Sequence, residues 1–424
     1  MAKPNLAYIP ATIGDKVYSI LPSDGVGDFD FTRADGSSPT GVTRINAQGL
    51  IEEVASGENR LNYSLLDGEV VGCPSLLLEP QSTNLVTYSE DFSNAIWLIQ
   101  NATVTTNDVI SPDGTQNADK LIENSSNSTH RILTVSGLTI SGNVVISVFA
   151  KKGERNWIRL TNNNIVGAFF DLENGLIGGV SGGIDAKIEK YNNGWYRCSI
   201  SATAVANERI GVYLSNNGVD TTYQGDGASG VYIWGATIEQ QSYITSYIKT
   251  NGSAVTRAAE TCNGSGNADT FNDSEGVLML EASSDETTSV IWSVSDGSNS
   301  NAVSLYYGNQ GVICDVFSSA GTRTLIATMP IGFRSNMNKF SIKYKSTDLA
   351  IWLNGFELAV STQTISLNGL NELEGAYGSG SFPFYGKTKQ IQYFDSALSD
   401  TELEQLTSWD SFRAMAEGQL YSIE

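Results

Sequence analysis

Apolar and polar residues alternate in short runs along most of the chain, which is the pattern expected of β-strands. Turn residues separate the runs between residues 84 and 250, as at Asn174-Gly175 and Asn193-Gly194. The runs are 144–150, 157–161, 167–173, 186–191, 195–202, 209–215 and 230–239. Short strands at this spacing, joined by such turns, predict a β-sandwich of the jelly-roll type.

A second block of strand-like runs begins at residue 275, with 275–283 and 288–297. Residues 339–345 alternate cleanly, so that Phe340, Ile342 and Tyr344 share one face of the predicted strand. Residues 349–360 predict a hairpin, because Asn354-Gly355 suits a type I′ turn. These patterns predict a second antiparallel sandwich over residues 275–424.

The end of the chain carries a helix signal. Ser399 and Glu402 have the spacing of a capping box, and Leu403 and Leu406 follow at helical spacing. The apolar face of this helix is expected to continue through Trp409, Phe412 and Met415, and the helix is expected to end at Gly418. The sequence therefore predicts a short C-terminal helix.

Residues 1–84 are rich in turn signals and poor in long apolar runs. They are expected to form an extended arm that packs on the C-terminal domain or on a neighbouring subunit. Residues 251–274 are polar and predict a linker. The predicted organisation is all-β. It comprises an arm at 1–84, a jelly roll at 85–250, a linker at 251–274, and a sandwich with a C-terminal helix at 275–424. The jelly roll is expected to be inserted in the sequence between the arm and the C-terminal domain on which the arm packs.

Composition and charge limit the classes of partner that the protein can have. The 424 residues suffice for two or three domains. The formal net charge of −21 disfavours nucleic acid and anionic lipid as partners, and the basic cluster at residues 151–155 is interpreted as a solvated turn. A signal peptide and a run of about 20 apolar residues are both lacking, so we expect a protein made in a cytoplasm, without membrane insertion.

The number and spacing of cysteine and histidine residues give little indication of a metal or redox site. The four cysteines lack paired spacing, so we expect reduced thiols rather than a zinc knuckle or a disulfide framework; they are Cys73, Cys198, Cys262 and Cys314. The chain contains one histidine, His130, which excludes zinc sites that need two histidines. We expect His130 on the solvated surface. No cofactor is expected, the metal content stays unknown, and structural calcium held by Asp or Glu at strand ends is left open.

Two motifs of catalytic type lack the required context. Residues 179–183 match G-x-S-x-G, but they connect two predicted strands rather than a strand and a helix. Residues 225–230 match G-x-G-x-x-G but lead into a strand, whereas a dinucleotide site requires a helix. No pair of carboxylates stands out as a glycosidase pair. We therefore assign no catalytic residue and expect a protein that is not an enzyme.

Aromatic residues are the remaining candidates for binding chemistry, because sugars pack their C–H faces on aromatic rings. Four tryptophans lie inside apolar strands and are expected in cores: Trp195, Trp234, Trp292 and Trp352. Three residues lie next to polar turns or polar neighbours and are the candidates for an exposed, glycan-binding platform: Trp157, Tyr213 and Tyr223.

Several stretches resemble known families. Residues 84–97 (NLVTYSEDFSNAIW), together with NGWYRCSIS and GVYIWGATIEQ, resemble a jelly-roll carbohydrate-binding module found in many bacteriophage structural proteins. LAIWLNG and residues 386–408 resemble a laminin-G or concanavalin-A-like lectin domain, including its helix start at Ala397-Leu398-Ser399. The arm is similar to an N-terminal segment of phage tail-fibre proteins. No individual sugar-binding residue of this chain is assigned from the resemblance.

The resemblance implies a virion protein: a tail-fibre, head-fibre or receptor-binding component that binds host surface polysaccharide. Its implied partners are other virion proteins and further copies of itself, with a trimer favoured. Two alternatives stay open, a purely structural decoration or adaptor protein without a glycan ligand, and a polysaccharide depolymerase. The sequence specifies neither the host nor the glycan.

Overall fold

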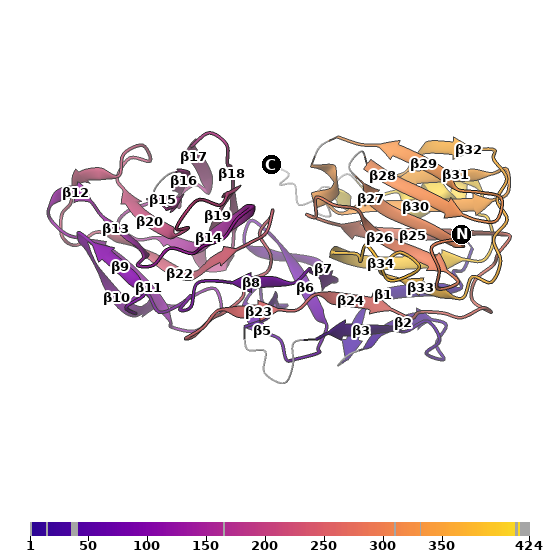
Figure 1. Ribbon diagram of the computed structural model, residues 1–424, viewed down its shortest axis with the longest axis horizontal. Helices are drawn as coiled ribbons and strands as arrows, with labels where there is room; N and C mark the ends of the chain where they lie inside the picture. Colours follow the sequence, from indigo (N-terminus) through magenta and orange to yellow (C-terminus); the bar gives the residue numbers. More distant parts are fainter. Residues whose placement is uncertain are drawn as a thin grey trace.

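The computed structural model describes residues 2–13, 16–34, 41–163, 166–308, 311–330, 332–411 and 414–415. Two β-structured bodies lie end to end along the long axis of the molecule, and N-terminal strands run along the side of both (Figure 1). The all-β prediction is confirmed, because the described residues form antiparallel sheets and one short α-helix. Within the described ranges, no helix has the length and apolar character needed to cross a membrane.

The first sandwich consists of two six-stranded sheets. The order of its inner sheet is β10 (Ala102–Val109), β11 (Ala118–Glu123), β22 (Gly230–Glu239), β14 (Asn143–Lys152), β19 (Trp195–Thr203) and β18 (Asp185–Lys190). The order of its outer sheet is β17 (Leu176–Val180), β16 (Val166–Asp171), β15 (Trp157–Asn162), β20 (Ile210–Ser215), β13 (Arg131–Thr134) and β9 (Trp97–Gln100). A small ribbon of β12 (Asn127–Thr129) and β21 (Thr222–Gln224) lies at one end.

The second sandwich consists of a large and a small sheet. The path of the large sheet is β24 (Glu260–Asn263), β3 (Phe29–Arg33), β2 (Lys16–Leu21), β1 (Leu6–Ile13), β34 (Gly386–Phe394), β25 (Glu275–Ser283), β30 (Asn338–Lys345), β31 (Leu349–Leu353) and β32 (Phe356–Ser361). The order of the small sheet is β29 (Arg323–Thr328), β28 (Gly311–Phe317), β27 (Ala302–Gly308), β26 (Val290–Ser295) and β33 (Glu372–Glu374).

The N-terminal segment contributes five of its strands to the second sandwich, namely β1, β2, β3, β6 (Arg60–Leu66) and β7 (Glu69–Leu78). Strand β34 has β25 on one side; on the other side it pairs with β7 near its start and with β1 near its end. Strand β6 pairs with β7. Residues 1–84, expected to be irregular, thus form regular strands, because their short apolar runs gain hydrogen-bonding partners from distant parts of the chain.

Residues 251–274, expected to be a polar linker, also contain strands. Strand β23 (Val255–Arg257) pairs with β8 (Ser82–Asn84), and β24 pairs with β3. Cys262 on β24 is buried in the core of the second sandwich. The polar composition of this segment concealed two strands whose pairing partners lie about 170 and 230 residues away in the sequence.

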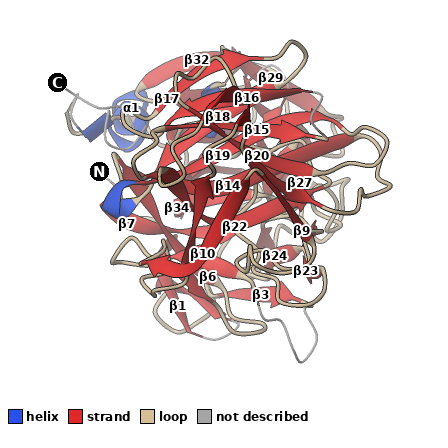
Figure 2. Cartoon of the chain, turned by 90° about the vertical axis from the view of Figure 1, so that its left-hand side faces the viewer, coloured by secondary structure: helices blue, strands red, loops and turns tan. Residues whose placement is uncertain are grey.

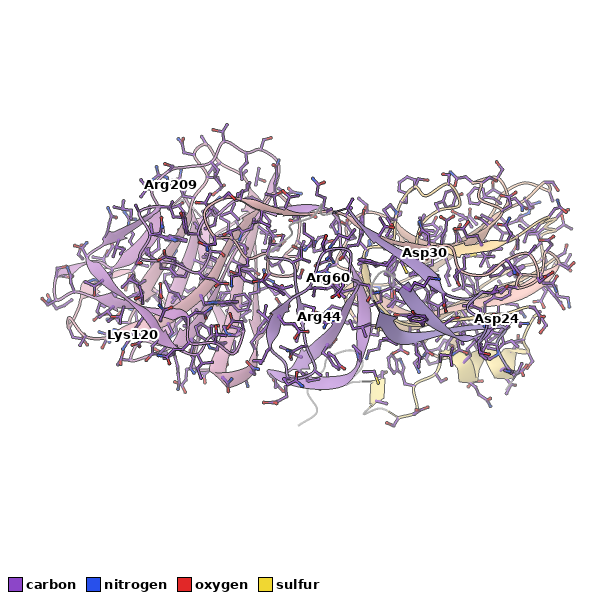
Figure 3. The ribbon with its side chains drawn as sticks, turned by 90° about the horizontal axis from the view of Figure 1, so that it is seen from below. Asp24, Asp30, Arg44, Arg60, Lys120 and Arg209 are labelled. Carbon is purple, nitrogen blue, oxygen red and sulfur yellow. The ribbon has the colours of Figure 1, made fainter. Side chains whose placement is uncertain are left out.

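A buried cluster of charged residues lies at the junction of the two sandwiches. We call it the junction ion cluster, and its members are Arg33, Arg60, Glu79, Arg257 and Glu260. Arg60, which lies between the two bodies in Figure 3, donates through Nε to Glu260 Oε1 at 2.8 Å. Burial raises the pKa of Glu79, but the guanidinium groups of Arg257 and Arg60 outweigh it and hold this pKa well below its usual range. Glu79 therefore keeps its charge while buried.

Helix α1 (Asp400–Thr407) covers one face of the large sheet, the face that carries Val277, Ala350 and Trp352. The capping box is confirmed, since Ser399 accepts from the Glu402 backbone and Glu402 in turn accepts from the Ser399 backbone. The predicted extension is wrong at Trp409, because the helix ends at Thr407 and Ser408 is extended. Phe412 and Gly418 lie outside the described residues.

The cap provides a first prediction. Replacing Ser399 with alanine removes the acceptor for the Glu402 backbone N–H, and we expect the free energy of unfolding to fall by about 1 kcal/mol. Urea unfolding measures this difference. Ser396→Ala is the control near the same helix, because Ser396 is exposed. A Ser399→Ala loss no larger than the control's would show that the cap contributes nothing.

Candidate functional site

The two sheets of the first sandwich differ in what covers their outward faces. Phe149, Trp195 and Trp234 project from the outward face of the inner sheet and are buried against Ile51 and Tyr247. The side chains of this face therefore have little contact with solvent. Among the described residues, no such cluster of large aromatic residues covers the outward face of the outer sheet, whose strands β15, β16, β17 and β20 are labelled in Figure 2.

Strand alternation places the side chains of this face. In β15, Ile158 and Leu160 point into the core, and Trp157 and Arg159 point outward and are partly exposed. In β16, Phe170 is buried in the same core and Phe169 is partly exposed. Alternation of period two therefore builds a core face and a polar–aromatic outward face from the same strands.

Cross-strand register brings five outward residues into one row. Arg131 pairs with Gln100 on one side and with Tyr213 on the other. Tyr213 pairs in turn with Arg159, and Arg159 pairs with Phe169. We call Gln100, Arg131, Tyr213, Arg159 and Phe169 the outer row.

The two arginines of the outer row lie against its aromatic rings. The guanidinium carbon of Arg131 is 5.1 Å from the centroid of the Tyr213 ring, and that of Arg159 is 5.7 Å from the centroid of the Phe169 ring. Arg131 also donates through Nε to Gln100 Oε1 at 2.6 Å and through Nη1 to Tyr213 Oη at 2.5 Å. The Arg131 guanidinium is thus held in place by neutral groups.

A cavity of about 440 Å³ lies beside the outer row. Arg159 and Phe169 line it, and loop residues Val219–Thr222 form another part of its wall. Val219 is 72% exposed and forms part of its rim. The cavity combines a cation, an aromatic ring, aliphatic groups and hydroxyls, which is the mixture that recognises a small polar ligand.

Trp157 projects from this face, but its ring is enclosed. A methyl group at Gly218 would lie 2.6 Å from Cδ2 and Cε3 of the Trp157 ring, and one at Gly178 would lie 2.9 Å from Cζ3. The side chain is partly buried. Glycines therefore pack against the indole, and the expectation that Trp157 forms an open stacking platform is not met.

The two predicted tyrosines are also less exposed than expected. Tyr213 belongs to the outer row, but only 4% of its surface is exposed, because Arg131 covers it. Tyr223 is 7% exposed; it lies on β21 and donates through its hydroxyl to Glu123 Oε2 at 2.6 Å. Burial raises the pKa of Tyr223, and the hydrogen bond to Glu123 raises it further. The structure thus brings Trp157 and Tyr213 onto one face and places Tyr223 elsewhere.

Arg131, Arg159 and Phe169 were not among the residues predicted from the sequence. A signal was present for Arg159, since an arginine between Ile158 and Leu160 in a strand must point away from the core. The joint placement of the three residues depends on the order and register of β13, β20, β15 and β16, which a single strand pattern does not contain.

His130 is buried, contrary to the expectation of a surface residue. Its Nδ1 lies 2.6 Å from the Asn101 carbonyl oxygen, and its ring lies 4.9 Å from that of Tyr223. The four cysteines are free, as expected, and Cys73 is the exposed one. Among the described residues, no group of three or more His, Cys, Asp or Glu side chains is arranged to hold a metal ion, and calcium stays a prediction.

A second cavity, of about 590 Å³, lies at the junction of the two sandwiches. Residues of the N-terminal segment and of both sandwiches line it, among them Tyr63, Tyr243 and Tyr385. On its wall, Lys187 and Glu189 form an ion pair at 2.9 Å. Further charged residues line this cavity, among them Arg197, Asp285 and Lys387, so its wall carries charges of both signs.

No protein-family model matches the chain, and no curated protein sequence matches it. Solved structures resemble parts of it. The CBM40 of Ruminococcus gnavus IT-sialidase is 20% identical over 32% of this chain and 84% of that chain, with a TM-score of 0.29. Domain 4 of a GH43 extracellular arabinanase from Geobacillus stearothermophilus, in complex with arabinotriose, is 11% identical over 35% of this chain and 73% of that chain, with a TM-score of 0.30. A leech intramolecular trans-sialidase is 21% identical over 33% of this chain and 24% of that chain, with a TM-score of 0.28. Each of these similarities covers about a third of this chain.

Proposed function

We propose that the outer sheet of the first sandwich binds carbohydrate without chemically changing it. The observation that carries this proposal is the outer row together with the adjoining cavity of about 440 Å³. A saccharide ring presents both C–H groups and hydroxyl groups. The Phe169 ring and Val180 suit the former, and Arg159, Ser181 and Thr222 suit the latter.

The rigidity of the outer row favours binding. Strands rather than loops hold its five residues, and hydrogen bonds to Gln100 and Tyr213 fix Arg131. Side chains that are already ordered lose less conformational entropy when a ligand binds. A shallow site of this kind still gives modest affinity for one sugar unit, so a multivalent assembly would strengthen the attachment.

We also propose that the protein acts as a phage virion appendage, as a trimer joined to other virion proteins, and uses this face to hold host surface glycans. The resemblance of residues 1–84 and 84–250 to segments of phage structural proteins supports this role, and residues 386–408 resemble a lectin domain. The outer sheet also supports it, since Arg131, Arg159 and Phe169 on its outward face are partly exposed.

Binding to a panel of immobilised bacterial polysaccharides tests the proposed function, with the Phe169→Ala variant as the probe. We expect wild-type protein to bind at least one polysaccharide and Phe169→Ala to bind it at least tenfold more weakly, because the ring and the arginine stacked on it are both disturbed. Phe356→Ala is the matched control, since Phe356 is 69% exposed on β32 of the second sandwich. Equal binding by wild type and Phe169→Ala would place the site elsewhere.

A further inference from the structure

The outer row carries two positive charges on one face. Arg131 lies on β13 and Arg159 on β15. Strand β20 lies between these two strands, and its Tyr213 pairs with both arginines. Neighbouring strands lie about 4.8 Å apart, so the two backbone positions are roughly 10 Å apart. Both side chains are partly exposed, and a ligand on this face can reach both guanidinium groups.

Within the described part of the chain, neither arginine has a carboxylate partner at ion-pair distance. The neutral groups of Gln100 and Tyr213 hold Arg131, and its Nη2 has no acceptor among the residues that the structure describes. The Arg159 guanidinium has no hydrogen-bond acceptor among the described residues, and it rests on the Phe169 ring. Arg155 in the same sandwich behaves differently, since it donates to Glu123 at 2.6 Å.

The net charge of the chain makes this arrangement notable. Acidic residues number 46 and basic residues 25, so acidic partners are abundant. One carboxylate, that of Asp220, lines the cavity together with Arg159, but Asp220 Oδ2 accepts a hydrogen bond from Asn217 Nδ2 at 3.1 Å and forms no ion pair with Arg159. A guanidinium left without a carboxylate in a cavity is suited to bind one from a ligand, because its planar fork matches both carboxylate oxygens.

Resting on the proposed function of this face, we propose that the glycan it binds is acidic, and that Arg159 holds a sugar carboxylate while Arg131 contributes a second positive charge on the same face. The Arg131 guanidinium covers the Tyr213 ring, and Arg159 and the Phe169 ring line the cavity together, so the face presents cations to the ligand beside one accessible aromatic ring. The ligand class is therefore a carboxylate-bearing saccharide, such as a uronic-acid polymer.

Matched pairs of acidic and neutral polysaccharides test this inference. The probes are polygalacturonate, alginate and hyaluronan oligosaccharides, each compared with a form in which the carboxyl groups have been reduced to alcohols. Isothermal titration calorimetry of the full-length protein is expected to show at least one acidic form binding tenfold or more tightly than its reduced form. This preference should shrink as salt is added.

Variants of Arg159 and Arg131 test whether these two residues cause the preference for acidic saccharides. Arg159→Gln is expected to reduce the acid preference at least fivefold, and Arg159→Lys to retain part of it, since lysine keeps the charge but not the fork. Arg131→Gln is a second, independent variant. Arg323→Gln on β29 is the matched control, because Arg323 lies in the other sandwich and donates to backbone carbonyl groups rather than to a carboxylate. Melting temperatures confirm that each variant is folded.

The outcomes separate the two proposals. Equal affinity for the acidic and reduced forms, or binding confined to neutral glycans, would overturn the acidic-ligand inference and leave carbohydrate binding in place. An acid preference that survives both Arg159→Gln and Arg131→Gln would overturn it as well. Binding to no saccharide among these probes or in the polysaccharide panel would overturn both.

Discussion

Replacing Glu260 with glutamine is expected to lower the free energy of unfolding by about 3–5 kcal/mol. Glu260 is fully buried and accepts hydrogen bonds from Arg60, from Arg33 and from the Glu79 backbone N–H. In the junction ion cluster three arginines face two glutamates, so removal of one negative charge leaves guanidinium groups without compensation in a site that water does not reach.

Urea unfolding of wild type and Glu260→Gln measures this loss. Glu275→Gln is the matched control, because Glu275 pairs with Lys345 at 2.7 Å at the surface, where such a pair contributes at most about 1 kcal/mol. If Glu260→Gln and Glu275→Gln lost the same small amount, the junction ion cluster would not stabilise the fold. The N-terminal strands would then be held by sheet pairing and apolar packing alone.

Replacing Gly218 with alanine is expected to cost about 2–4 kcal/mol, the sum of two effects. The backbone φ of Gly218 is +71°, a left-handed conformation that costs an alanine roughly 1–2 kcal/mol. The added methyl group would also lie 2.6 Å from two atoms of the Trp157 ring, so the indole or the loop must move. The loss should appear in thermal unfolding.

Two other glycines of the first sandwich separate these effects. Gly142 has a φ of +79° and open space around it, so Gly142→Ala should show the backbone cost alone. Gly182 also has open space and no left-handed φ, and Gly182→Ala should change stability by less than about 0.5 kcal/mol. A Gly218→Ala loss equal to that of Gly142→Ala would show that the Trp157 ring is not packed as described.

Local features of the fold were predictable because their causes lie within a few residues. Asn354 and Gly355 both adopt positive φ between β31 and β32, as the predicted type I′ hairpin requires. The capping box formed where Ser399 and Glu402 indicated it. The alternation of residues 339–345 was also correct, with Phe340 in the main core. Each of these signals depends on turn chemistry or side-chain period, which a short segment contains in full.

Features that depend on distant pairing were not predictable in this way. Tyr213 belongs to a strand that ends at a polar turn, and His130 lies beside polar residues in the sequence. In the structure, Arg131 covers Tyr213, and His130 is buried with its Nδ1 against the Asn101 carbonyl oxygen. A polar neighbour in sequence points to the opposite face of a strand and says little about what covers a side chain in space. The outer row likewise exists only because β13, β20, β15 and β16 are neighbours in this order.

Hydrogen–deuterium exchange of the full-length protein, with and without the polysaccharide fragment that binds best, tests whether the outer sheet of the first sandwich is the carbohydrate-binding surface. We expect slower exchange confined to β15, β16 and residues 216–222, with the second sandwich unchanged. Protection at the junction cavity or on the second sandwich, with the outer sheet unaffected, would contradict this expectation.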